Sequence, residues 1–223
     1  ALLKHTLFLI YLTLAAITHS HAAMSPELAS MLQNKYLTEV DKALINQSEE
    51  LQALYQHLLI DRDLPAPPKI KANKINPSKI PATKDEYGFS DYKSAIIGKP
   101  RLGEDAVMID EDGNIRHLRY RPQTQADIDF LSRFKKLNYL HLQSSSQHLK
   151  HVTLPNLSAL KELRFDLSRT EKLDFGKTSI PLKAILIRGN RNLNTLANIK
   201  HLENLEHLTV FPSTLSDYTE LEH

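Results

Sequence analysis

The sequence predicts an α/β fold: a short repeat solenoid built on a parallel β-sheet, preceded by an α-helical segment. One pattern, apolar-x-x-apolar-x-apolar, returns five times, with steps of 22, 23, 22 and 23 residues between its first positions. Such self-similarity indicates stacked repeats. In the N-terminal part, apolar residues instead recur at helical spacing. The repeated pattern covers residues 115–120, 137–142, 160–165, 182–187 and 205–210.

Composition excludes some classes of function. The 28 basic and 26 acidic residues leave a net charge of +2 on 223 residues, so no overall positive field favours nucleic acid. The chain has 0 cysteines, which excludes disulfides, thiolate metal sites and a cysteine nucleophile. Its apolar content of 41% suits either one large domain or two small ones.

Residues 1–22 are predicted to be a secretory signal peptide. Lys4 and His5 precede an apolar run over residues 6–17, and Ser20 and Ala22 are small residues at positions that a signal peptidase reads. An uncleaved membrane anchor is the alternative, but the run is shorter than the roughly 20 residues of a spanning helix. Residues 221–223 look like the remnant of a polyhistidine tag, and we expect no function there.

Residues 23–63 are the predicted helical segment. Ser25 and Pro26 are typical of a helix start, and Ser48 is placed to cap a second helix, although one long helix is the alternative. The mixed charge of the polar face favours packing against the rest of the protein or a partner helix over lying on a membrane. The apolar positions are Leu28, Met31, Leu32, Tyr36, Val40, Ala43 and Leu44, then Leu51, Leu54, Tyr55, Leu58 and Leu59.

Residues 64–82 are rich in proline and lysine and contain no acid. Because proline fixes φ and removes backbone donors, we expect an extended linker that separates the helices from the repeats. The PxxP match at Pro65–Pro68 is a weak indication of a ligand segment. Residues 83–106 are predicted to be an irregular loop that caps the end of the repeats.

Residues 106–120 are predicted to form a β-hairpin around an acidic turn that contains Gly113. A calcium loop is the alternative for Asp110 and Asp112, but the EF-hand needs glycine at its sixth position and a glutamate at its twelfth. The second strand of this hairpin is also the first repeat strand. We therefore expect the hairpin to cap the N-terminal end of the repeats.

Residues 107–220 are the predicted repeat domain, and their pattern resembles the leucine-rich repeat family. Residues 182–190 match its nine-residue signature, and the resemblance implies that Asn190 hydrogen-bonds backbone groups in the next turn. Residues 193–205 are similar to the internalin-like subclass, which has short 3₁₀ turns on its convex side. We expect extended convex segments near residues 152–155 and 173–175, and a helix over residues 125–134. At the position of Asn190 the other repeats carry Gln123, Ser145, Ser168 and Ser213.

Stacking makes the first, fourth and sixth positions of each repeat point inward, so the third, fifth and seventh point outward on one sheet face. The resemblance implies that this face binds a macromolecular partner. The third-position column is His117, Tyr139, Glu162, Ala184 and His207. The fifth is Arg119, His141, Arg164, Leu186 and Thr209, and the seventh is Arg121, Gln143, Asp166, Arg188 and Phe211.

Arginine and tyrosine, which are enriched in binding hot spots, gather in the first three repeats, whereas the last two offer apolar residues. We expect a partner surface that is acidic and partly apolar; a featureless polar face is the alternative. The predicted partner-binding residues are His117, Arg119, Arg121, Tyr139, His141, Glu162, Arg164, Asp166, Leu186, Arg188 and Phe211.

No reaction is predicted on this face. His141 lies between Arg119 and Arg164 of the neighbouring repeats, and two flanking cations lower the pKa of an imidazole. No serine, threonine or lysine nucleophile is placed beside it, and the other histidine pairs lack the further ligands that zinc needs. We therefore expect no enzyme activity, no catalytic residue, no metal site and no cofactor.

The sequence thus predicts an exported, periplasmic or secreted protein that recognises another protein, as a recognition, adhesion or immunity/inhibitor-like module. Two alternatives stay open: a structural or assembly protein of the cell envelope that oligomerises through its N-terminal helices, and a binder of polyanions or acidic glycans. Nucleic acid is not expected, and membrane contact is expected only through the signal peptide before cleavage. The end of the last repeat, with Phe211 and Leu215, is a second expected contact surface.

Overall fold

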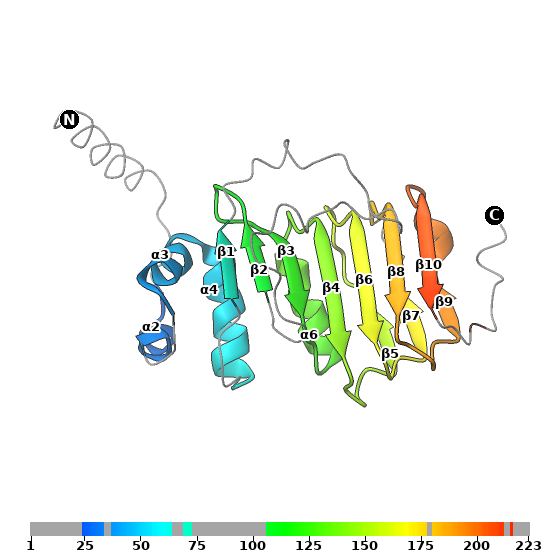
Figure 1. Cartoon of the computed structure of the whole chain (residues 1–223), viewed down its shortest axis with the longest axis horizontal. Coiled ribbons are helices and arrows are strands. Elements are labelled where there is room, and N and C mark those ends of the chain that lie inside the picture. The colour runs from blue at the N-terminus through cyan, green and yellow to red at the C-terminus, as the bar shows by residue number, and fades with distance from the viewer. Residues whose placement is uncertain are drawn as a thin grey trace.

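The computed structural model describes residues 24–33, 37–63, 69–72, 106–177, 180–211 and 215. These residues form a mixed α/β structure with a mostly parallel sheet and a few helices, three of which lie at its N-terminal end (Figure 1). The predicted signal peptide, the tag remnant, and most of the predicted linker and capping loop lie outside the described residues.

The N-terminal helical segment consists of short helices with polar caps. The side-chain oxygens of Ser25, Thr38 and Ser48 each accept a hydrogen bond from the backbone N–H three residues later. Thr38 also forms a reciprocal capping box with Asp41. The elements are α2 (Pro26–Gln33), α3 (Glu39–Gln47), α4 (Glu49–Tyr55) and a π-helical continuation of α4, η1 (Gln56–Asp61).

The apolar stripe of this segment is not one continuous face. Ser48 has extended backbone and both ends α3 and begins α4, so the alternative of one long helix is wrong. The residues of α3 that face the core also differ from the predicted ones. Val40 is 67% exposed, and Ile45 is buried instead. The second stripe is confirmed, since Leu51, Leu54, Tyr55, Leu58 and Leu59 are all buried.

The predicted hairpin is confirmed: β2 (Ala106–Ile109) pairs antiparallel with β3 (Ile115–Tyr120). Gly113 in its turn has a φ of +80°, which favours glycine. The Asp110 carboxylate accepts hydrogen bonds from the backbone N–H groups of Asp112 and Asn114, so it is used within the turn itself.

A further strand lies outside the hairpin. β1 (Lys69–Ala72) pairs parallel with β2, so this part of the predicted linker belongs to the sheet. Lysine and isoleucine alternate at residues 69–71, which is the period of a strand, and Ile70 packs against the core. The linker interpretation is therefore wrong for residues 69–72.

The main sheet has seven strands in the order β1-β2-β3-β4-β6-β8-β10, and every pair of neighbours except β2–β3 is parallel. From β4 onward the chain alternates between this sheet and a second, parallel sheet of three strands, β5-β7-β9. The remaining main-sheet strands are β4 (Tyr139–Ser144), β6 (Glu162–Leu167), β8 (Ala184–Arg188) and β10 (His207–Phe211). The second sheet holds β5 (His151–Thr153), β7 (Lys172–Asp174) and β9 (Thr195–Ala197).

The connections opposite the main sheet follow the expectations closely. β5 and β7 lie at the predicted extended segments. The predicted first-repeat helix is α6 (Gln125–Asp129), which tightens into the 3₁₀ turn η3 (Phe130–Arg133). Near residue 200 the 3₁₀ turn η4 (Ile199–His201) is present, but β9 precedes it, so that part of the run is more extended than expected.

The Asn190 side chain makes the expected hydrogen bonds to backbone groups. Its fully buried side chain donates from Nδ2 to the Thr170 carbonyl at 2.9 Å and accepts at Oδ1 from two N–H groups of the next turn at 3.0 Å. One repeat earlier, Thr170 rather than Ser168 is the buried turn residue, and its hydroxyl donates to the Leu149 carbonyl at 2.7 Å. The buried residue that bonds the neighbouring turn is therefore a threonine in this repeat, two residues beyond the predicted position.

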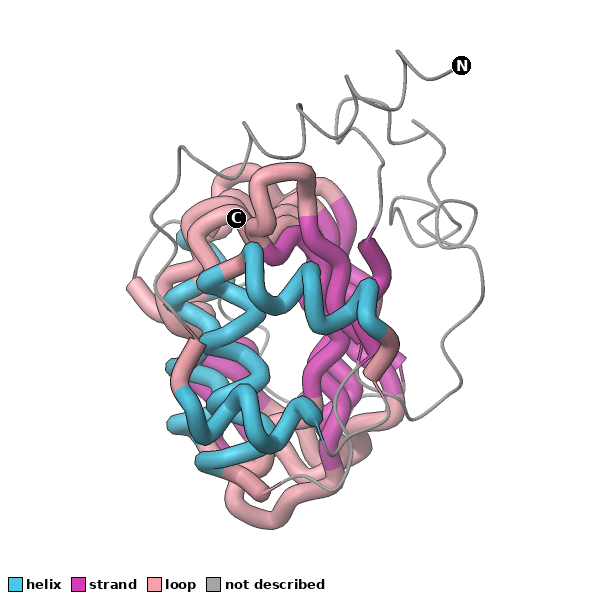
Figure 2. Tube along the Cα trace, turned by 90° about the vertical axis from the view of Figure 1, so that its left-hand side faces the viewer, coloured by secondary structure: helices cyan, strands magenta, loops and turns pink. Residues whose placement is uncertain are grey.

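One hydrophobic core joins the helices to the repeats. The inward positions of the first four repeats are at most 1% exposed, and they share a single cluster with Leu28, Leu54 and Leu58 of the helical segment. Figure 2 shows the helices as a layer facing the strands. The expectation that the helical stripe packs against the rest of the protein is therefore confirmed, and the described helices share one core with the repeats.

Two hydrogen bonds hold the helices to the hairpin. The Ser48 hydroxyl donates to the Gly113 carbonyl, and the Glu50 carboxylate accepts from the Ile115 N–H. Burial raises the pKa of Glu50, whereas the bond from Ile115 opposes that rise. The beginning of α4 is thus bonded directly to the turn of the hairpin.

Candidate functional site

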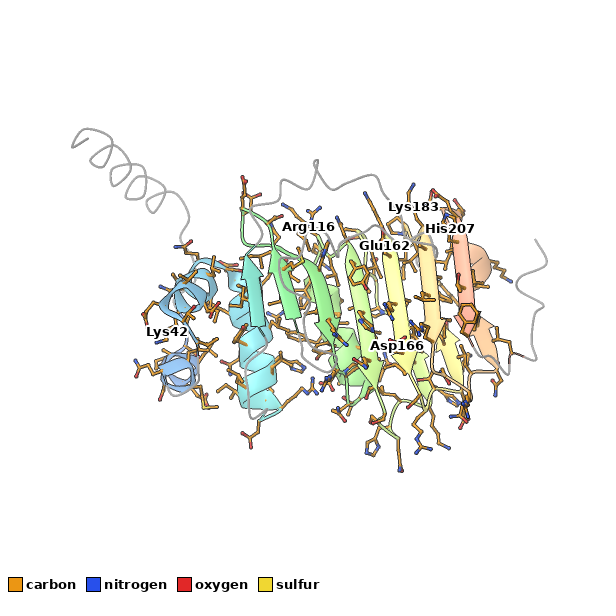
Figure 3. The ribbon with its side chains drawn as sticks, viewed as in Figure 1. Lys42, Arg116, Glu162, Asp166, Lys183 and His207 are labelled. Atoms are coloured by element: carbon orange, nitrogen blue, oxygen red, sulfur yellow. The ribbon has the colours of Figure 1, made fainter. Side chains whose placement is uncertain are left out.

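Strand pairing aligns the predicted outward positions side by side. The third-position and fifth-position columns are confirmed across all five repeats, and in the seventh Gln143 is opposite Asp166 and Arg188 is opposite Phe211. Figure 3 shows Glu162 and Asp166 on β6 and His207 on β10 of the same sheet. The sheet therefore presents a regular grid of side chains, as the repeat spacing predicted.

The face is less open than predicted. His117 and His141 are 8% exposed, Glu162 is 7% exposed and Leu186 is 2% exposed, so these four predicted contact residues are buried. Ala184 and Leu186 form a small apolar cluster of their own, with Tyr139 packed against it. Strands lie about 4.8 Å apart, so a large side chain on one strand packs over its neighbours. The prediction that these four residues are open to a partner is corrected accordingly.

The polar side chains at the centre of the face pair with one another. His141 Nε2 lies 2.8 Å from Asp166 Oδ2, and Arg164 Nε lies 3.5 Å from the same oxygen. Arg119 Nη2 donates to Gln143 Oε1 at 2.9 Å. Burial lowers the pKa of His141, the hydrogen bond to Asp166 opposes this, and the two arginines add to the lowering. The predicted direction is confirmed, but burial is a larger cause than the arginines.

Two aromatic groups beside this cluster are held in their neutral forms. Burial, with a contribution from Arg116, lowers the pKa of His117 to about 4. Burial raises the pKa of Tyr139 to about 12. The two rings lie 5.6 Å apart between centroids. His117 and Tyr139 therefore add no charge to the face at neutral pH.

The open part of the face lies in the last two repeats. Arg188, His207 and Phe211 are exposed, and Phe211 is one of two large apolar side chains, with Val40, that are exposed among the described residues. Phe211 is opposite Arg188 on the neighbouring strand. The prediction placed the main contact in the first three repeats and also included Arg188 and Phe211, and it is these last two that are exposed. Arg119, Arg121, Tyr139, Arg164 and Asp166 are partly buried.

The exposed pair of Arg188 and Phe211 marks a surface, but it does not indicate a protein family. Comparison with protein-family models, curated proteins and solved structures found no match. Function is therefore inferred from geometry and residue chemistry.

A second polar cluster, which no sequence pattern predicted, joins η1 to the first repeat. His57 Nε2 lies 3.0 Å from both the Tyr120 hydroxyl and Asp127 Oδ1. The His57 ring stacks on Phe130, with centroids 4.1 Å apart. Arg62 Nε lies 3.6 Å from Asp127 Oδ1. These contacts place a nearly buried carboxylate between two basic side chains of the N-terminal segment.

Asp127 is anchored from its own side as well. Its second oxygen accepts from the backbone N–H groups of Gln123 at 2.6 Å and Thr124 at 3.1 Å. Burial raises the pKa of Asp127, but the hydrogen bonds and the charge of Arg62 outweigh it, so the pKa is lowered overall. The only local signal in the sequence was the capping pair Thr124 and Asp127, which reveals nothing about the distant His57.

The described ranges contain neither a metal-binding group of side chains nor a membrane-spanning helix. No group of three or more histidine, aspartate or glutamate side chains among them is placed to hold a metal ion. No helix in that part of the chain is both long and apolar enough to cross a membrane.

Proposed function

We propose that the chain is a short leucine-rich repeat solenoid of the internalin-like type. Three features support this proposal. Parallel strands recur in register at steps of 22 and 23 residues. They alternate with the strands of a second parallel sheet. The Asn190 side chain bonds the turns of neighbouring repeats, as the signature of the family implies.

We further propose an exported protein, periplasmic or secreted, that binds another protein through the outward face of its main sheet as a recognition, adhesion or inhibitor-like module. The observation that carries this proposal is the exposed Arg188 beside the exposed Phe211 on paired strands. Arginine and aromatic residues are enriched at binding hot spots, and a sheet holds them in a pre-organised arrangement. The sequence of residues 1–22 supports export.

The accessible side chains suggest the chemistry of the partner. Among the charged residues of the predicted site, Arg188 is the exposed one. A complementary surface is acidic, because like charges across an interface disfavour association. Phe211, at 51% exposure, requires an apolar depression beside that acid. The proposed partner is therefore a protein with an acidic side chain next to an apolar pocket.

A paired capture experiment tests this proposal. The wild-type chain, Arg188→Glu and Phe211→Ser are immobilised in equal amounts and exposed to extract from the cells that naturally make the protein. Truncating a hot-spot residue costs about 2 kcal/mol or more, so recovery of a true partner at limiting concentration falls roughly thirtyfold in both variants. Circular dichroism checks that each variant is folded.

Matched substitutions elsewhere control for charge and hydrophobicity. Lys135→Glu reverses an exposed charge near η3, and Val40→Ser removes the exposed apolar side chain of α3. A partner of this face is retained by both controls and lost by both site variants. If every captured protein is retained by Arg188→Glu and Phe211→Ser, the binding face lies elsewhere and the proposal fails.

The alternative of assembly through the N-terminal helices loses its main support. Leu51, Leu54 and Leu58, which would have met a partner helix, are at most 1% exposed within this chain. The alternative of a polyanion binder rested on the arginine face and an extended lysine-rich linker, and part of that linker, residues 69–72, is strand β1. We therefore favour a protein partner.

A further inference from the structure

Both sheets end at the same place. Within the described ranges, β10 is the last strand of the main sheet and pairs only with β8, and β9 is the last strand of the second sheet and pairs only with β7. Figure 1 shows β9 and β10 together at the end of the molecule opposite the helices. Among the described residues, each edge presents backbone groups with no neighbouring strand.

In the described part of the chain, the core residues at this end are less buried than those of the other repeats. The inward positions of the first four repeats are at most 1% exposed. Their equivalents in the fifth repeat, Leu205, Leu208 and Val210, are only partly buried against the core. Leu215, the single described residue beyond Phe211, is also only partly buried there. An apolar stripe therefore remains partly open along β10.

The two edges of the main sheet differ in their protection. β1 reads Lys-Ile-Lys-Ala, and lysine in the sequence of an edge strand commonly disfavours pairing with another strand. β10 reads His-Leu-Thr-Val-Phe and contains no charged residue, no proline and no register shift in its pairing with β8. Glu206, just before it, is paired with Lys183 at 2.9 Å. The β10 edge therefore has the features of an edge that pairs with another strand.

The sequence of β10 is also complementary to itself. When two copies run antiparallel with Thr209 opposite Thr209, each Leu208 is opposite a Val210 on the inward side. On the outward side each His207 is opposite a Phe211. Cross-strand threonine pairs and apolar pairs stabilise antiparallel strands, and this register opposes no two charges.

We propose that the occupant of the β10 edge is a second copy of this chain, related by a two-fold axis that passes through Thr209. Such an isologous contact closes after two copies, whereas repeated end-to-end stacking would not. The axis is perpendicular to the sheet, so the inward stripes of both copies merge and both outward faces stay on the same side. The β9 edges meet their own counterparts across the same axis. This proposal does not depend on the partner proposed above.

Charge at the axis tests this geometry directly. Thr209 is outward and partly exposed, so a long charged side chain there reaches solvent in a single copy. Sedimentation equilibrium of the full chain between about 1 and 100 µM is expected to show twice the 25.4 kDa chain mass for the wild type. Thr209→Lys and Thr209→Glu each place two like charges opposite one another and weaken self-association at least about tenfold.

Mixing the two variants separates a two-fold contact from a general loss of structure. An equimolar mixture of Thr209→Lys and Thr209→Glu pairs opposite charges at the axis, and is expected to recover the dimer mass. Val40→Lys, on the exposed face of α3, is the matched control and stays dimeric. The proposal is overturned by a wild type that remains monomeric throughout this range, or by a mixture that does not recover the dimer. Neither result bears on capture of a partner by Arg188 and Phe211.

Discussion

Replacing Asp127 with asparagine tests the buried cluster between η1 and the first repeat. Asparagine keeps the shape and an oxygen acceptor but removes the negative charge beside Arg62 and His57. The Arg62 and Asp127 side chains are 10% and 6% exposed, so water screens their attraction weakly. Removing one partner of a buried pair costs about 3–5 kcal/mol. Because Arg62 also donates to the Arg121 carbonyl at 2.8 Å, we expect the lower end of that range, about 3 kcal/mol.

The measurement is urea unfolding at neutral pH, followed by circular dichroism, for the wild type and Asp127→Asn. Asp129→Asn is the control, since Asp129 lies two residues later, is exposed and bonds Gln125 on the same helix at 2.8 Å. We expect the control to change the free energy of unfolding by about 0.5 kcal/mol at most.

The pH dependence gives a second readout. The pKa of Asp127 is lowered in the folded protein, so its contribution is complete above the unfolded value of about 3.9 and is lost as pH falls through the folded value. The difference between wild type and Asp127→Asn should therefore shrink below about pH 4. A neutral-pH loss no greater than that of the control, or a difference that persists in acid, would refute the reasoning.

Two further predictions concern His117 and the turn glycines. The folded pKa of His117 is about 4 against 6.5 for the free side chain, so the neutral form is favoured and stability falls as pH drops below 6.5. By about pH 4.5 this amounts to roughly 2 kcal/mol, and His117→Gln should remove that part of the slope in urea unfolding between pH 7 and 4.5. At Gly113, with φ +80°, an added Cβ lies 3.0 Å from the Ser48 Cβ, whereas at Gly189, with φ +67°, it meets nothing within 4 Å. Gly113→Ala should therefore cost about 2 kcal/mol and Gly189→Ala about 1 kcal/mol, and equal losses in thermal unfolding would show that the Ser48 contact is unimportant.

The spacing of apolar residues predicted the strands and their pairing because one physical constraint controls both. A parallel strand must align its inward residues with those of the next, so the step of 22 or 23 residues also aligned His117 with Tyr139 and Arg119 with His141. The capping residues Ser25 and Ser48 were predictable for a similar reason, since their bonds are local.

Exposure was not predictable from the same pattern. Alternation shows which side of the sheet a residue faces, but its burial depends on the sizes of its neighbours. Tyr139 packs against the cluster that contains Leu186, and Asp166 pairs with both His141 and Arg164. The accessible part of the face therefore moved from the first three repeats to Arg188 and Phe211.

Contacts between distant parts of the chain were also beyond the sequence pattern. His57 meets Tyr120 and Asp127 across separations of 63 and 70 residues, and no periodicity signals such a meeting. Proline content led to a linker over residues 64–82, although the alternation around Ile70 already had the period of a strand. Composition describes the average behaviour of a segment, whereas four residues suffice to add a strand.

The bonds from α4 to the hairpin set an order for folding during synthesis. Ser48 caps α4 and also donates to the Gly113 carbonyl, 65 residues later, and Glu50 accepts from Ile115 across the same separation. Because domains emerge from the ribosome at about 5–20 residues per second, the helices wait several seconds for the turn that completes them. During that interval β3 and the later strands are not yet available to cover the stripe around Leu54. A nascent chain halted before residue 113 should therefore expose apolar surface that chaperones bind, and one halted after β3 should expose less.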